Sequence, residues 1–499
     1  MWCAPICVPK PRARWSVSDI ARSSLSLPRR QPALSALPLL SARDLEAPLA
    51  WRAGVPLSAR RFLADADAQA ARLPVHGPMV NLCVDRYHFA VGLAAALIRG
   101  HASLLPPNVL PETLAGLRQP GAPAAPYGLT DDEALTAPGI TLLEVGRHLT
   151  DDSPLIERAI PQIDPAQRAA CLLTSGSTGA SQPHAKTWRA LVLNIESEAR
   201  RLAELLQRPS LTGLNIVATV PAQHSYGFES SVLLALLGGA AFDSGRPYFP
   251  ADIAVALGRL PRPRALVTTP FHLKTLLLSG VALPPTDLVL CATAPLSPQL
   301  ALEAERRFDG PLVEIYGCTE AGQVATRRTV SSEVWHTFDS LVIRRESPGA
   351  DPAQPAQFIV QGGHVEQPTA LPDVLQLADA RHFRLLGRAN DLIHVAGKRS
   401  SLGYLNHHLN SIPGVVDGAF WLPDDVVDGI VRPVAFVVAP ELDVSQVIAA
   451  LRQRIEDVFV PRRIVFVPSL PRADTGKLPA QALREWAQAR LSSLPKARP

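Results

Sequence analysis

The hexapeptide Thr174-Ser175-Gly176-Ser177-Thr178-Gly179 places two glycines among four small hydroxyl residues, so its backbone amides and hydroxyls can surround an anion. It follows the apolar run at residues 169–173, which is typical of a buried strand. It precedes an amphipathic stretch in which one helical face carries Leu191, Ile195, Ala199, Leu202 and Leu206. The pattern predicts a strand, an anion-binding loop and then a helix, with a plain Gly/Ser/Thr turn as the alternative.

A Walker phosphate-binding motif is absent from the sequence. The two Gly-Lys pairs, Gly397-Lys398 and Gly476-Lys477, are followed by Arg399 and Leu478 rather than by Ser or Thr. The chain is therefore not a P-loop ATPase.

The composition is that of an ordinary enzyme with two or more domains. The chain has 499 residues, of which 47% are hydrophobic and 19% are charged. A net charge of +4 is small for this length, so we expect no nucleic-acid partner. The cysteines lack paired metal-ligand spacing apart from Cys3 and Cys7, and this favours a reduced, cytoplasmic protein.

Two segments are relevant to targeting. Residues 89–105 are apolar but are interrupted by Arg99-Gly100-His101 and are too short to cross a membrane, so we expect a core helix followed by a strand and no membrane insertion. Residues 1–36 are basic, rich in Ser, Pro and Arg, and have no clear periodicity. We predict a disordered leader there, with a transit peptide as the alternative.

Between residues 165 and 320, short apolar runs end in polar or Gly/Pro turns and are followed by helical stretches, which predicts parallel α/β structure. The five runs lie at residues 172–173, 216–220, 265–267, 288–291 and 312–315. Ligands of open parallel sheets bind at the carboxyl ends of the strands. We therefore expect the five segments that follow these runs to form one crevice.

The character of the chain changes after residue 350. Residues 350–385 predict a small antiparallel sheet, and a linker is expected at residues 388–391. Beyond it we predict strands at residues 419–422, 432–438 and 464–467, and helices at residues 445–459 and 480–491. The predicted fold class is α/β, with a large N-terminal α/β domain containing parallel sheets over residues 37–388 and a smaller C-terminal α+β domain over residues 389–499.

Four motifs in the same order make the chain similar to the adenylate-forming superfamily, which includes acyl- and aryl-CoA synthetases and nonribosomal-peptide adenylation domains. They are residues 174–179, the Tyr316-Gly317-Cys318-Thr319-Glu320 segment, Asp373 followed fifteen positions later by Arg388, and the Pro471 to Lys477 loop. The resemblance covers about residues 40–485. It implies that the large domain binds adenylate and that the small domain is mobile.

The resemblance also implies roles that suit the residue types. Adenylation brings a carboxylate to the α-phosphate of ATP, so cations must neutralise charge at phosphorus. Lys477 would bridge these two anions, and Glu320 would hold Mg²⁺, a hard cation that prefers carboxylate oxygen. Thr319 and Thr178 would offer hydroxyls to phosphate. A solvated surface residue is the alternative for Lys477 and for Glu320.

The remaining nucleotide contacts would come from six residues. Asp373 would accept hydrogen bonds from the ribose hydroxyls and Arg388 would contact ribose or phosphate, with a simple salt bridge as the alternative for this pair. Tyr316, with Gly317 beside it, would line the adenine site, and Ala294 and Pro295 would supply backbone contacts. Tyr316, Ala294 and Pro295 are equally acceptable as core residues.

The acid pocket is assigned by the same resemblance to His224, Tyr226, Gly227 and Thr269, with Gly317 as a further wall. Relatives that activate amino acids carry an Asp near residues 223–229, and no Asp occurs there. A flat aromatic acid or a medium-chain acyl acid is therefore favoured over an α-amino acid. A satisfied core histidine is the alternative for His224.

Two positions depart from the family pattern. The Pro-Lys pair that usually follows the phosphate loop is missing, and the displaced Lys186 is expected to serve the phosphates instead. In the small domain, Tyr404 and Asn406 replace acidic residues, which puts the thiol-acceptor surface in doubt. Asn390 occupies the hinge position.

The chain also resembles the AMP-ligases of bacterial aryl-polyene pigment clusters, including the xanthomonadin type. Three features carry this resemblance: the spacing of the phosphate loop, residues 223–229 and Trp188. This narrower resemblance implies activation of a hydroxybenzoate-like acid with ATP and Mg²⁺, followed by transfer to the phosphopantetheine thiol of an acyl carrier protein. Two alternatives stay open: a ligase that uses free CoA, and a degenerate nucleotide-binding scaffold without ligase activity.

Overall fold

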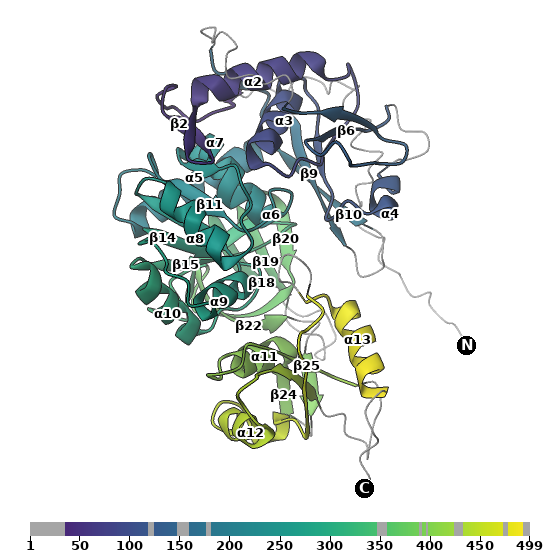
Figure 1. Cartoon of the computed structure of the whole chain (residues 1–499), viewed down its shortest axis with the longest axis vertical. Coiled ribbons are helices and arrows are strands. Elements are labelled where there is room, and N and C mark those ends of the chain that lie inside the picture. Colours follow the sequence, from purple (N-terminus) through teal and green to yellow (C-terminus); the bar gives the residue numbers. More distant parts are fainter. Residues whose placement is uncertain are drawn as a thin grey trace, which may run out of the picture. The chain divides into compact units, whose positions relative to one another are not determined.

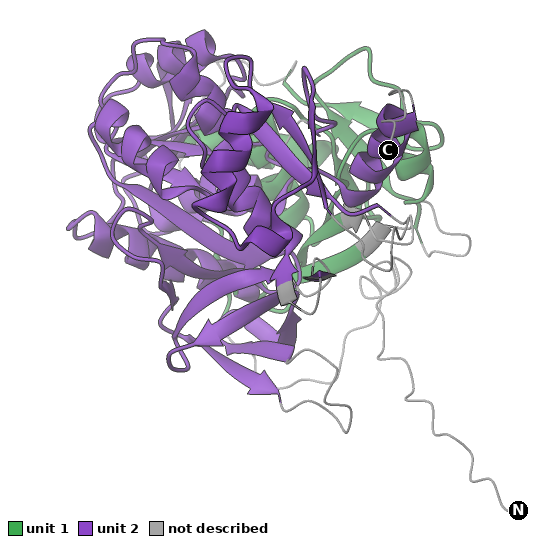
Figure 2. Ribbon diagram, turned by 90° about the horizontal axis from the view of Figure 1, so that it is seen from below, with its two compact units in different colours: residues 1–39, 60–189 green, residues 40–59, 190–499 purple. Residues whose placement is uncertain are grey.

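The computed structural model describes residues 35–117, 124–146, 159–175, 181–346, 357–388, 392–395, 398–423, 433–472 and 478–492. The chain forms two compact units, which Figure 2 distinguishes by colour. Unit 1 comprises residues 1–39 and 60–189, and unit 2 comprises residues 40–59 and 190–499. The leader up to residue 34, Gly176, Ser177, Thr178, Gly179, Asn390 and Lys477 lie outside the described residues, so the predictions for them stay predictions.

Unit 1 is built on a six-stranded sheet with the order β10-β9-β5-β4-β6-β7. All neighbours are parallel except β9 and β10, which form an antiparallel hairpin. The strands are β4 (Met79–Asn81), β5 (Ser103–Leu105), β6 (Tyr127–Thr130), β7 (Thr141–Glu144), β9 (Arg168–Ser175) and β10 (Ser181–Thr187). A separate antiparallel pair joins β1 (Leu37–Pro38) to β8 (Gln162–Ile163).

Among its described residues, unit 1 has the helices α2 (Ala59–Arg72), which begins at the unit boundary, α3 (Arg86–Ile98) and α4 (Pro111–Ala115). α3 is buried over nearly its whole length and is followed by the buried strand β5. The predicted core helix and strand within residues 89–105 are therefore confirmed. In the part of the chain that the structure describes, no helix is both long and apolar enough to cross a membrane.

Unit 2 contains an eleven-stranded sheet with the order β21-β22-β17-β16-β15-β14-β13-β11-β12-β2-β3. The central run from β15 to β2 is parallel, and the strands on both flanks are antiparallel. The strands are β2 (Pro48–Arg52), β3 (Val55–Ser58), β11 (Asn215–Ala218), β12 (Ala241–Asp243), β13 (Arg264–Thr268), β14 (Leu288–Cys291), β15 (Leu312–Cys318), β16 (Gly322–Arg327), β17 (Trp335–Thr337), β21 (Asp373–Leu377) and β22 (His382–Arg388).

Three helices, α8 (Pro250–Arg259), α9 (Pro270–Leu278) and α10 (Pro298–Phe308), pack on one side of the parallel strands (Figure 1). Each begins with proline, whose fixed φ and missing N–H suit the first helical turn. Their inner faces share one apolar core with β11, β13, β14 and β15. The other helices before α8 are α5 (Trp188–Leu205), α6 (Ser225–Gly227), the π-helix η1 (Phe228–Leu233) and α7 (Leu234–Gly238).

The rest of unit 2 starts with an antiparallel sheet of β18 (Leu341–Glu346), β19 (Gln357–Gly362) and β20 (Val365–Leu371), which confirms the antiparallel sheet predicted after residue 350. The C-terminal elements are β23 (Leu392–Val395), β24 (Lys398–Ser401), α11 (Leu402–Asn410), β25 (Asp417–Trp421), β26 (Val434–Val438), α12 (Val444–Arg452), η3 (Asp457–Phe459), β27 (Arg463–Phe466) and α13 (Ala480–Ser492). Helix α11 was not predicted. The helix predicted at residues 445–459 is two elements, because α12 ends at Arg452 and a separate 3₁₀ turn follows.

Two predictions about the parallel strands were wrong. The helix does not follow the Thr174 loop directly, because residues 181–187 first form β10 against β9. The five apolar runs do not share one sheet either, since the first lies in β9 of unit 1 and the other four lie in unit 2. Hydrophobic periodicity identifies strands, but it does not say which sheet a strand joins.

Candidate active site

Four neighbouring strands bring most of the described candidate residues to one edge of the unit 2 sheet. Val217, Leu266, Val289 and Leu312 lie in one row across β11, β13, β14 and β15. Because these strands are parallel and in this register, the segments that follow them leave the sheet on the same side. The ends of the strands and these segments carry His224, Tyr226, Gly227, Thr269, Ala294, Pro295, Tyr316, Gly317, Thr319 and Glu320.

Tyr316 and Asp373 form the best-defined polar contact among the predicted nucleotide residues. The Tyr316 hydroxyl donates to Asp373 Oδ2 at 2.8 Å. The Tyr316 ring is 8% exposed and packs edge-on against Phe383 and, tilted, against Trp335, with ring centroids 5.6 and 5.7 Å apart. The ring packing fixes the hydroxyl, and the hydroxyl in turn orients the half-buried carboxylate of Asp373.

Arg388 is brought to the same place by strand pairing. In the antiparallel pair β21–β22, Asp373 lies directly opposite Arg388. The preceding Gly387 has φ +128°, and a Cβ there would lie 2.3 Å from Ser401 Oγ. Only glycine fits this position, because the space of its side chain is filled by the residue that caps α11. The glycine of the Gly-Arg motif is therefore the point at which β22 passes close to the start of α11.

Thr319 and Glu320 lie in the tight turn between β15 and β16, where Cys318 pairs with Gly322. Glu320 is exposed and Thr319 is half-buried. No group of three or more His, Cys, Asp or Glu residues that could hold a metal occurs among the described residues. Mg²⁺ bound to nucleotides usually takes only one or two protein carboxylates besides phosphate and water, so a single carboxylate at this turn fits that mode.

Ala294 and Pro295 are exposed in the segment after β14, and Gly317 is exposed at the end of β15. A Cβ on Gly317 would lie 2.4 Å from the carbonyl oxygen of Gly322, so the β15–β16 hairpin requires glycine there. These exposed positions are compatible with backbone contacts to a ligand.

The predicted acid-pocket residues have different surroundings. Gly227 is buried, and a Cβ on it would lie 2.0 Å from the carbonyl oxygen of Pro221. Tyr226 is 9% exposed, and burial raises the pKa of its hydroxyl well above the usual value. His224 is half-buried and immediately precedes α6.

Thr269 has a structural role as well as its position at the sheet edge. It is 1% exposed, and its side chain caps α9 by accepting a hydrogen bond from the backbone N–H of His272 at 3.3 Å. The His272 ring is itself held by Thr219, whose hydroxyl lies 2.9 Å from Nδ1. Any contact of Thr269 with an acid is therefore additional to capping.

The base of the Lys477 loop is anchored to the C-terminal sheet. Arg472 makes a two-pronged ion pair with Asp417 of β25, with N–O distances of 2.7 and 2.6 Å. Asn406, one of the two departures from the family pattern, accepts a hydrogen bond from the backbone N–H of Phe420 at 2.6 Å, which ties α11 to the same strand. Tyr404, the other departure, is 44% exposed.

The displaced lysine lies far along the hairpin from the phosphate loop. Lys186 pairs with Ala170, five positions beyond the Ser181–Ser175 pair that closes the loop, and it is 8% exposed. Five residues of strand span about 17 Å, which is more than a lysine side chain reaches. A phosphate contact by Lys186 stays a prediction, and this placement does not favour it.

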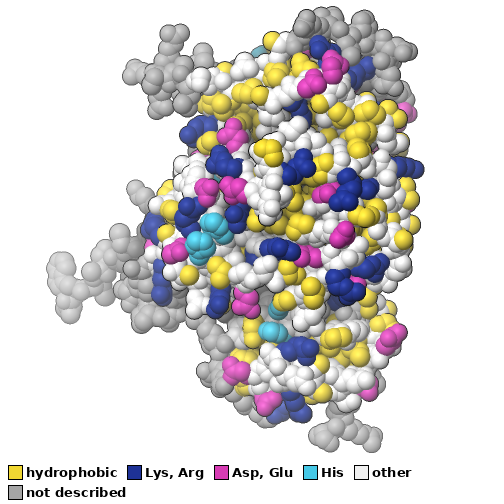
Figure 3. All heavy atoms as spheres, turned by 90° about the vertical axis from the view of Figure 1, so that its left-hand side faces the viewer, with side chains coloured by type: hydrophobic (Ala, Val, Ile, Leu, Met, Phe, Trp, Pro, Cys, Tyr) yellow, Lys and Arg dark blue, Asp and Glu magenta, His cyan; other side chains and the backbone are white. Residues whose placement is uncertain are grey.

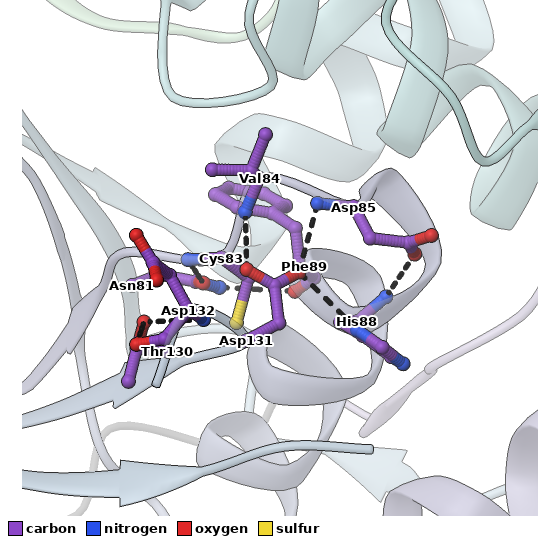
Figure 4. Close-up of polar contacts among 9 residues, drawn as sticks. All are labelled: Asn81, Cys83, Val84, Asp85, His88, Phe89, Thr130, Asp131 and Asp132. Atoms are coloured by element: carbon purple, nitrogen blue, oxygen red, sulfur yellow. Dashed lines mark hydrogen bonds and ion pairs between the residues drawn. The ribbon is translucent and has the colours of Figure 1, made fainter. Parts of the chain in front are cut away.

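A polar cluster in unit 1 was not predicted as functional, and its contacts account for it structurally (Figure 4). Asp131, which follows β6, accepts hydrogen bonds from the backbone N–H groups of Val84 and Asp85, both at 2.8 Å, and lies 3.2 Å from the His88 ring. Burial alone would raise the pKa of Asp131, but the hydrogen bonds from His88, Val84 and Asp85 outweigh it and lower that pKa. The cluster ties the start of α3 to the end of β6.

Sequence reasoning missed a second group of buried polar residues, in unit 2. Asn194 and Glu198 lie on α5 and are 2% and 0% exposed. A signal was available, because both fall on the face of the helix that carries Leu191, Ile195 and Leu202. Polar residues in an apolar stripe indicate a buried polar contact.

Charges of both signs are interspersed over the face of the molecule shown in Figure 3. That distribution agrees with the small net charge of +4. On this face nothing resembles the basic stripe that a nucleic-acid-binding protein presents.

Comparisons with known proteins agree with the motifs. Residues 121–342 match the AMP-binding enzyme family, and residues 407–477 match the AMP-binding enzyme C-terminal domain. The chain is 30% identical over 325 residues to a 4-coumarate–CoA ligase of Rhodobacter capsulatus, covering 64% of this chain and 75% of that protein. It is also 30% identical over 246 residues to a 4-coumarate–CoA ligase of Halorhodospira halophila, covering 48% of this chain and only 55% of that protein.

Solved structures share the fold. The O-succinylbenzoate CoA synthetase of Bacillus subtilis in complex with AMP superposes with a TM-score of 0.70 at 18% identity, covering 89% of this chain and 94% of that one. The anthranilate CoA ligase AuaEII in complex with anthranoyl-AMP gives 0.71 at 15% identity, covering 96% and 98%. With the matches above, the chain belongs to the adenylate-forming superfamily of AMP-binding enzymes, as an AMP-forming acid–thiol ligase that activates an acyl or aryl acid.

Proposed function

We propose that this enzyme activates an aromatic, hydroxybenzoate-like acid with Mg²⁺ and ATP and transfers it to the phosphopantetheine thiol of an acyl carrier protein. One observation supports nucleotide binding above all: the Tyr316 hydroxyl donates to Asp373, which lies opposite Arg388 in the β21–β22 pair. These residues lie at the edge of the sheet where four parallel strands end. This arrangement gives a fixed carboxylate, which suits a diol such as ribose, next to a cationic residue.

In the first half-reaction, a carboxylate oxygen of the acid attacks the α-phosphorus of ATP. The acyl–phosphate bond forms, the α–β phosphoanhydride bond breaks, and pyrophosphate leaves. Lys477 neutralises the two anions as they meet, and Arg388 adds positive charge near the nucleotide. Thr319 and the hydroxyls of the 174–179 loop donate to phosphate oxygens.

Mg²⁺ would be held by Glu320, and when bound it would neutralise phosphate charge. Asp373 orients the ribose by accepting from its hydroxyls, and Tyr316 keeps that carboxylate in place. Ala294, Pro295 and Gly317 border the adenine. His224, Tyr226, Gly227 and Thr269 border the acid.

In the second half-reaction the thiol attacks the acyl carbonyl carbon, a thioester forms and AMP leaves with the electrons of the broken C–O bond. We propose that the region from residue 389 to the end rotates about Asn390 between the two steps. The anchored base of the 471–477 loop supports this, because the Arg472–Asp417 pair lets Lys477 move together with the C-terminal sheet.

Free CoA is the second candidate acceptor. It is favoured by the two relatives that carry the name 4-coumarate–CoA ligase. The carrier-protein assignment rests on the narrower resemblance to the aryl-polyene AMP-ligases, which also suggests a role in pigment biosynthesis. A cytoplasmic site of action is part of the proposal, supported by the buried thiols of Cys171 and Cys291, which form no disulfide in the described part of the chain.

The test is ATP–pyrophosphate exchange with a panel of benzoates, cinnamates and fatty acids, followed by thioester formation with holo-carrier protein or with CoA. We expect exchange that depends on an aromatic acid and faster thioester formation on the carrier. Faster acylation of CoA would replace the carrier by CoA. Exchange that needs no acid, or none with any acid of the panel, would favour a nucleotide-binding scaffold.

A further inference from the structure

Helix α9 contacts the C-terminal elements of unit 2 through Phe271 and Lys274, which lie about one turn apart on the same face of the helix. The guanidinium carbon of Arg472 lies over the Phe271 ring, 5.7 Å from its centroid, within the range of a cation–π interaction. The Lys274 ammonium lies 3.5 Å from the carbonyl oxygen of Asn410, the last residue of α11. We call these four residues the α9 contact.

The α9 contact lies next to the edge of the sheet that carries the candidate nucleotide residues. Helix α9 begins at Pro270, directly after Thr269 at the end of β13. Arg472 belongs to the base of the 471–477 loop. The contact therefore holds the start of that loop at the edge where Lys477 would neutralise charge during adenylation.

The two halves of the α9 contact are separated in the sequence by the proposed hinge. Phe271 and Lys274 precede Asn390, whereas Asn410 and Arg472 follow it. If the C-terminal region rotates about Asn390, the contact has to open in the course of that rotation. Its strength therefore affects how readily the enzyme passes from the first half-reaction to the second.

The hydrogen bonding of Lys274 in this contact is weak. An ammonium has three N–H donors, and among the described residues this one has a single hydrogen bond, at 3.5 Å, which is long for an N–H···O bond. The nearby carboxylate of Asp417 is buried and already occupied. It accepts two hydrogen bonds from Arg472, at 2.7 and 2.6 Å, and one from the backbone N–H of Gly418 at 2.8 Å.

The titration of Lys274 shows the cost of this position. Burial lowers the pKa of Lys274 to about 8; the charge of Asp417 opposes this shift, and the charge of Arg472 adds to it. The half-buried ammonium is therefore less stable in the contact than in water, where the pKa of a lysine is 10.5. The charge on Lys274 thus weakens the contact, and a neutral side chain of similar length would strengthen it.

The histidines near the contact titrate in a different pH range. The pKa of His407, in α11, is lowered to about 4, mainly by burial and in part by the charges of His408 and of Arg327 in β16. The pKa of His408 is lowered by burial and by the charge of Arg454. Both imidazoles are therefore largely neutral at pH 7 and above. Among these groups, Lys274 is the one that changes its charge between pH 7 and 10.

Lysine is a rare residue in this chain. Of the 49 Lys and Arg residues, six are lysines, namely Lys10, Lys186, Lys274, Lys398, Lys477 and Lys496. Arginine stays protonated and offers five donors in a fixed fork, whereas lysine is a single charge whose pKa shifts readily on burial. A lysine at position 274 therefore suits a contact that has to open.

We propose that Lys274 is a positioning residue that keeps the α9 contact weak enough to open after adenylation, and that it thereby sets the balance between the two half-reactions. It acts through Asn410 and Arg472 rather than on the reacting atoms. This inference rests on the proposed function, because it needs the rotation about Asn390, but it does not depend on the identity of the acid or of the thiol.

The experiment measures the two half-reactions separately in the wild type and in Lys274→Met, with 3- or 4-hydroxybenzoate as the acid. The first is the formation of aryl-AMP in a single turnover without thiol. The second is thioester formation when CoA or holo-carrier protein is added to the preformed aryl-AMP complex. At about pH 7.5 we expect Lys274→Met to slow the second step about tenfold and to leave the first step unchanged or faster. An unchanged second step, or a slower first step, would overturn the proposal.

Arg307→Met is the matched control. The guanidinium of Arg307, in α10, is half-buried like Lys274 and donates to the backbone carbonyls of Leu277 and Val281 at 3.4 and 2.9 Å. All three residues precede the hinge, so this variant should leave both half-reactions close to the wild type. An equal slowing of the second step in Arg307→Met would show a general effect of lost helix contacts and would remove the role from Lys274.

A pH series supplies a readout that a merely structural role would not move. Because the pKa of Lys274 is lower in the closed contact than in the open one, raising the pH from about 8 to 10 favours the closed contact. The guanidinium introduced by Lys274→Arg keeps its proton over this range. We expect the second-step rate of the wild type, divided by that of Lys274→Arg, to fall about tenfold between about pH 7 and 9.5, since ionisation of the thiol affects both equally. A constant ratio would contradict the role of Lys274.

The outcomes separate this inference from the proposed function. If the wild type forms no aryl-AMP from any acid of the panel, the proposed function fails and this inference fails with it. If both half-reactions proceed and Lys274→Met leaves their balance unchanged, only the role of Lys274 fails. Should Lys274→Met not fold, as judged by thermal denaturation, the pH series of the wild type against Lys274→Arg still decides the matter.

Discussion

Replacing Tyr316 by phenylalanine should weaken ATP binding while leaving acid binding intact. The change keeps the ring that packs against Phe383 and Trp335 and removes only the hydroxyl that donates to Asp373 at 2.8 Å. The carboxylate then loses the group that holds its orientation toward the ribose. Its own charge and its pairing opposite Arg388 remain.

The size of the effect follows from the burial of the pair. A hydrogen bond to a charged group contributes about 1.5–3 kcal/mol, and water can replace part of it because Asp373 is only half-buried. We therefore expect a loss of about 1 kcal/mol, which corresponds to a roughly fivefold increase in the KM for ATP. The unfolding free energy should fall by about the same amount.

The assay is ATP–pyrophosphate exchange with ATP and the acid varied in turn, together with urea denaturation. Tyr87→Phe is a matched control, because it removes a hydroxyl that donates to Asp65 at 2.6 Å in unit 1. This control should lower stability and leave the KM for ATP unchanged. If Tyr316→Phe also lowers stability without changing the KM for ATP, the bond is structural only and the reasoning is refuted.

Three further predictions concern other parts of the chain. Lys477→Ala should abolish acid-dependent pyrophosphate release with little change in thermal stability, and undiminished release would remove this lysine from the mechanism. Gly387→Ala should destabilise the protein by more than about 1 kcal/mol in urea denaturation, since the new Cβ would lie 2.3 Å from Ser401 Oγ at a φ of +128°. The control is Gly258→Ala in α8, where the Cβ meets open space, and it should be neutral or stabilising by up to about 1 kcal/mol. Equal effects of the two substitutions would contradict this prediction. Between about pH 4.5 and 8 the folded protein retains the Glu198 proton, whereas the unfolded chain has lost it. Because of this group, the unfolding free energy should fall as pH rises, by up to about 1.4 kcal/mol per pH unit. The fall should end above the folded pKa of Glu198, which is about 8. Glu198→Gln should remove that component from stability measured by urea denaturation across the range, and an unchanged pH dependence would show that the carboxyl is not held neutral.

Much of the site could be predicted because its residues are tied to local sequence patterns. Tyr316, Asp373 and Arg388 lie in motifs whose spacing survives in the sequence, and the structure pairs Asp373 with Arg388 and with Tyr316. The proline and hydroxyl residues that begin α9 and α10 are equally local signals.

The errors concern long-range pairing. The pairing of residues 181–187 with β9, and the membership of β9 in a separate sheet, depend on contacts that no local periodicity encodes. The short helix α11 was missed because its apolar positions are few, although Ser401 caps it clearly. The buried polar residues of α5, Asn194 and Glu198, were missed because the hydroxyl that donates to Glu198 belongs to Ser230, which lies 32 residues further along the chain.

The central claim is that the chain forms an acyl-adenylate from ATP and a phenolic acid. The most direct measurement is the formation of aryl-AMP in a single turnover, followed by mass spectrometry, with 3- or 4-hydroxybenzoate and Mg·ATP and with no thiol present. We predict one equivalent of hydroxybenzoyl-AMP per enzyme and much less benzoyl-AMP from benzoate. Pyrophosphate release without any aryl-AMP, or no adenylate from any acid of the panel, would contradict the account.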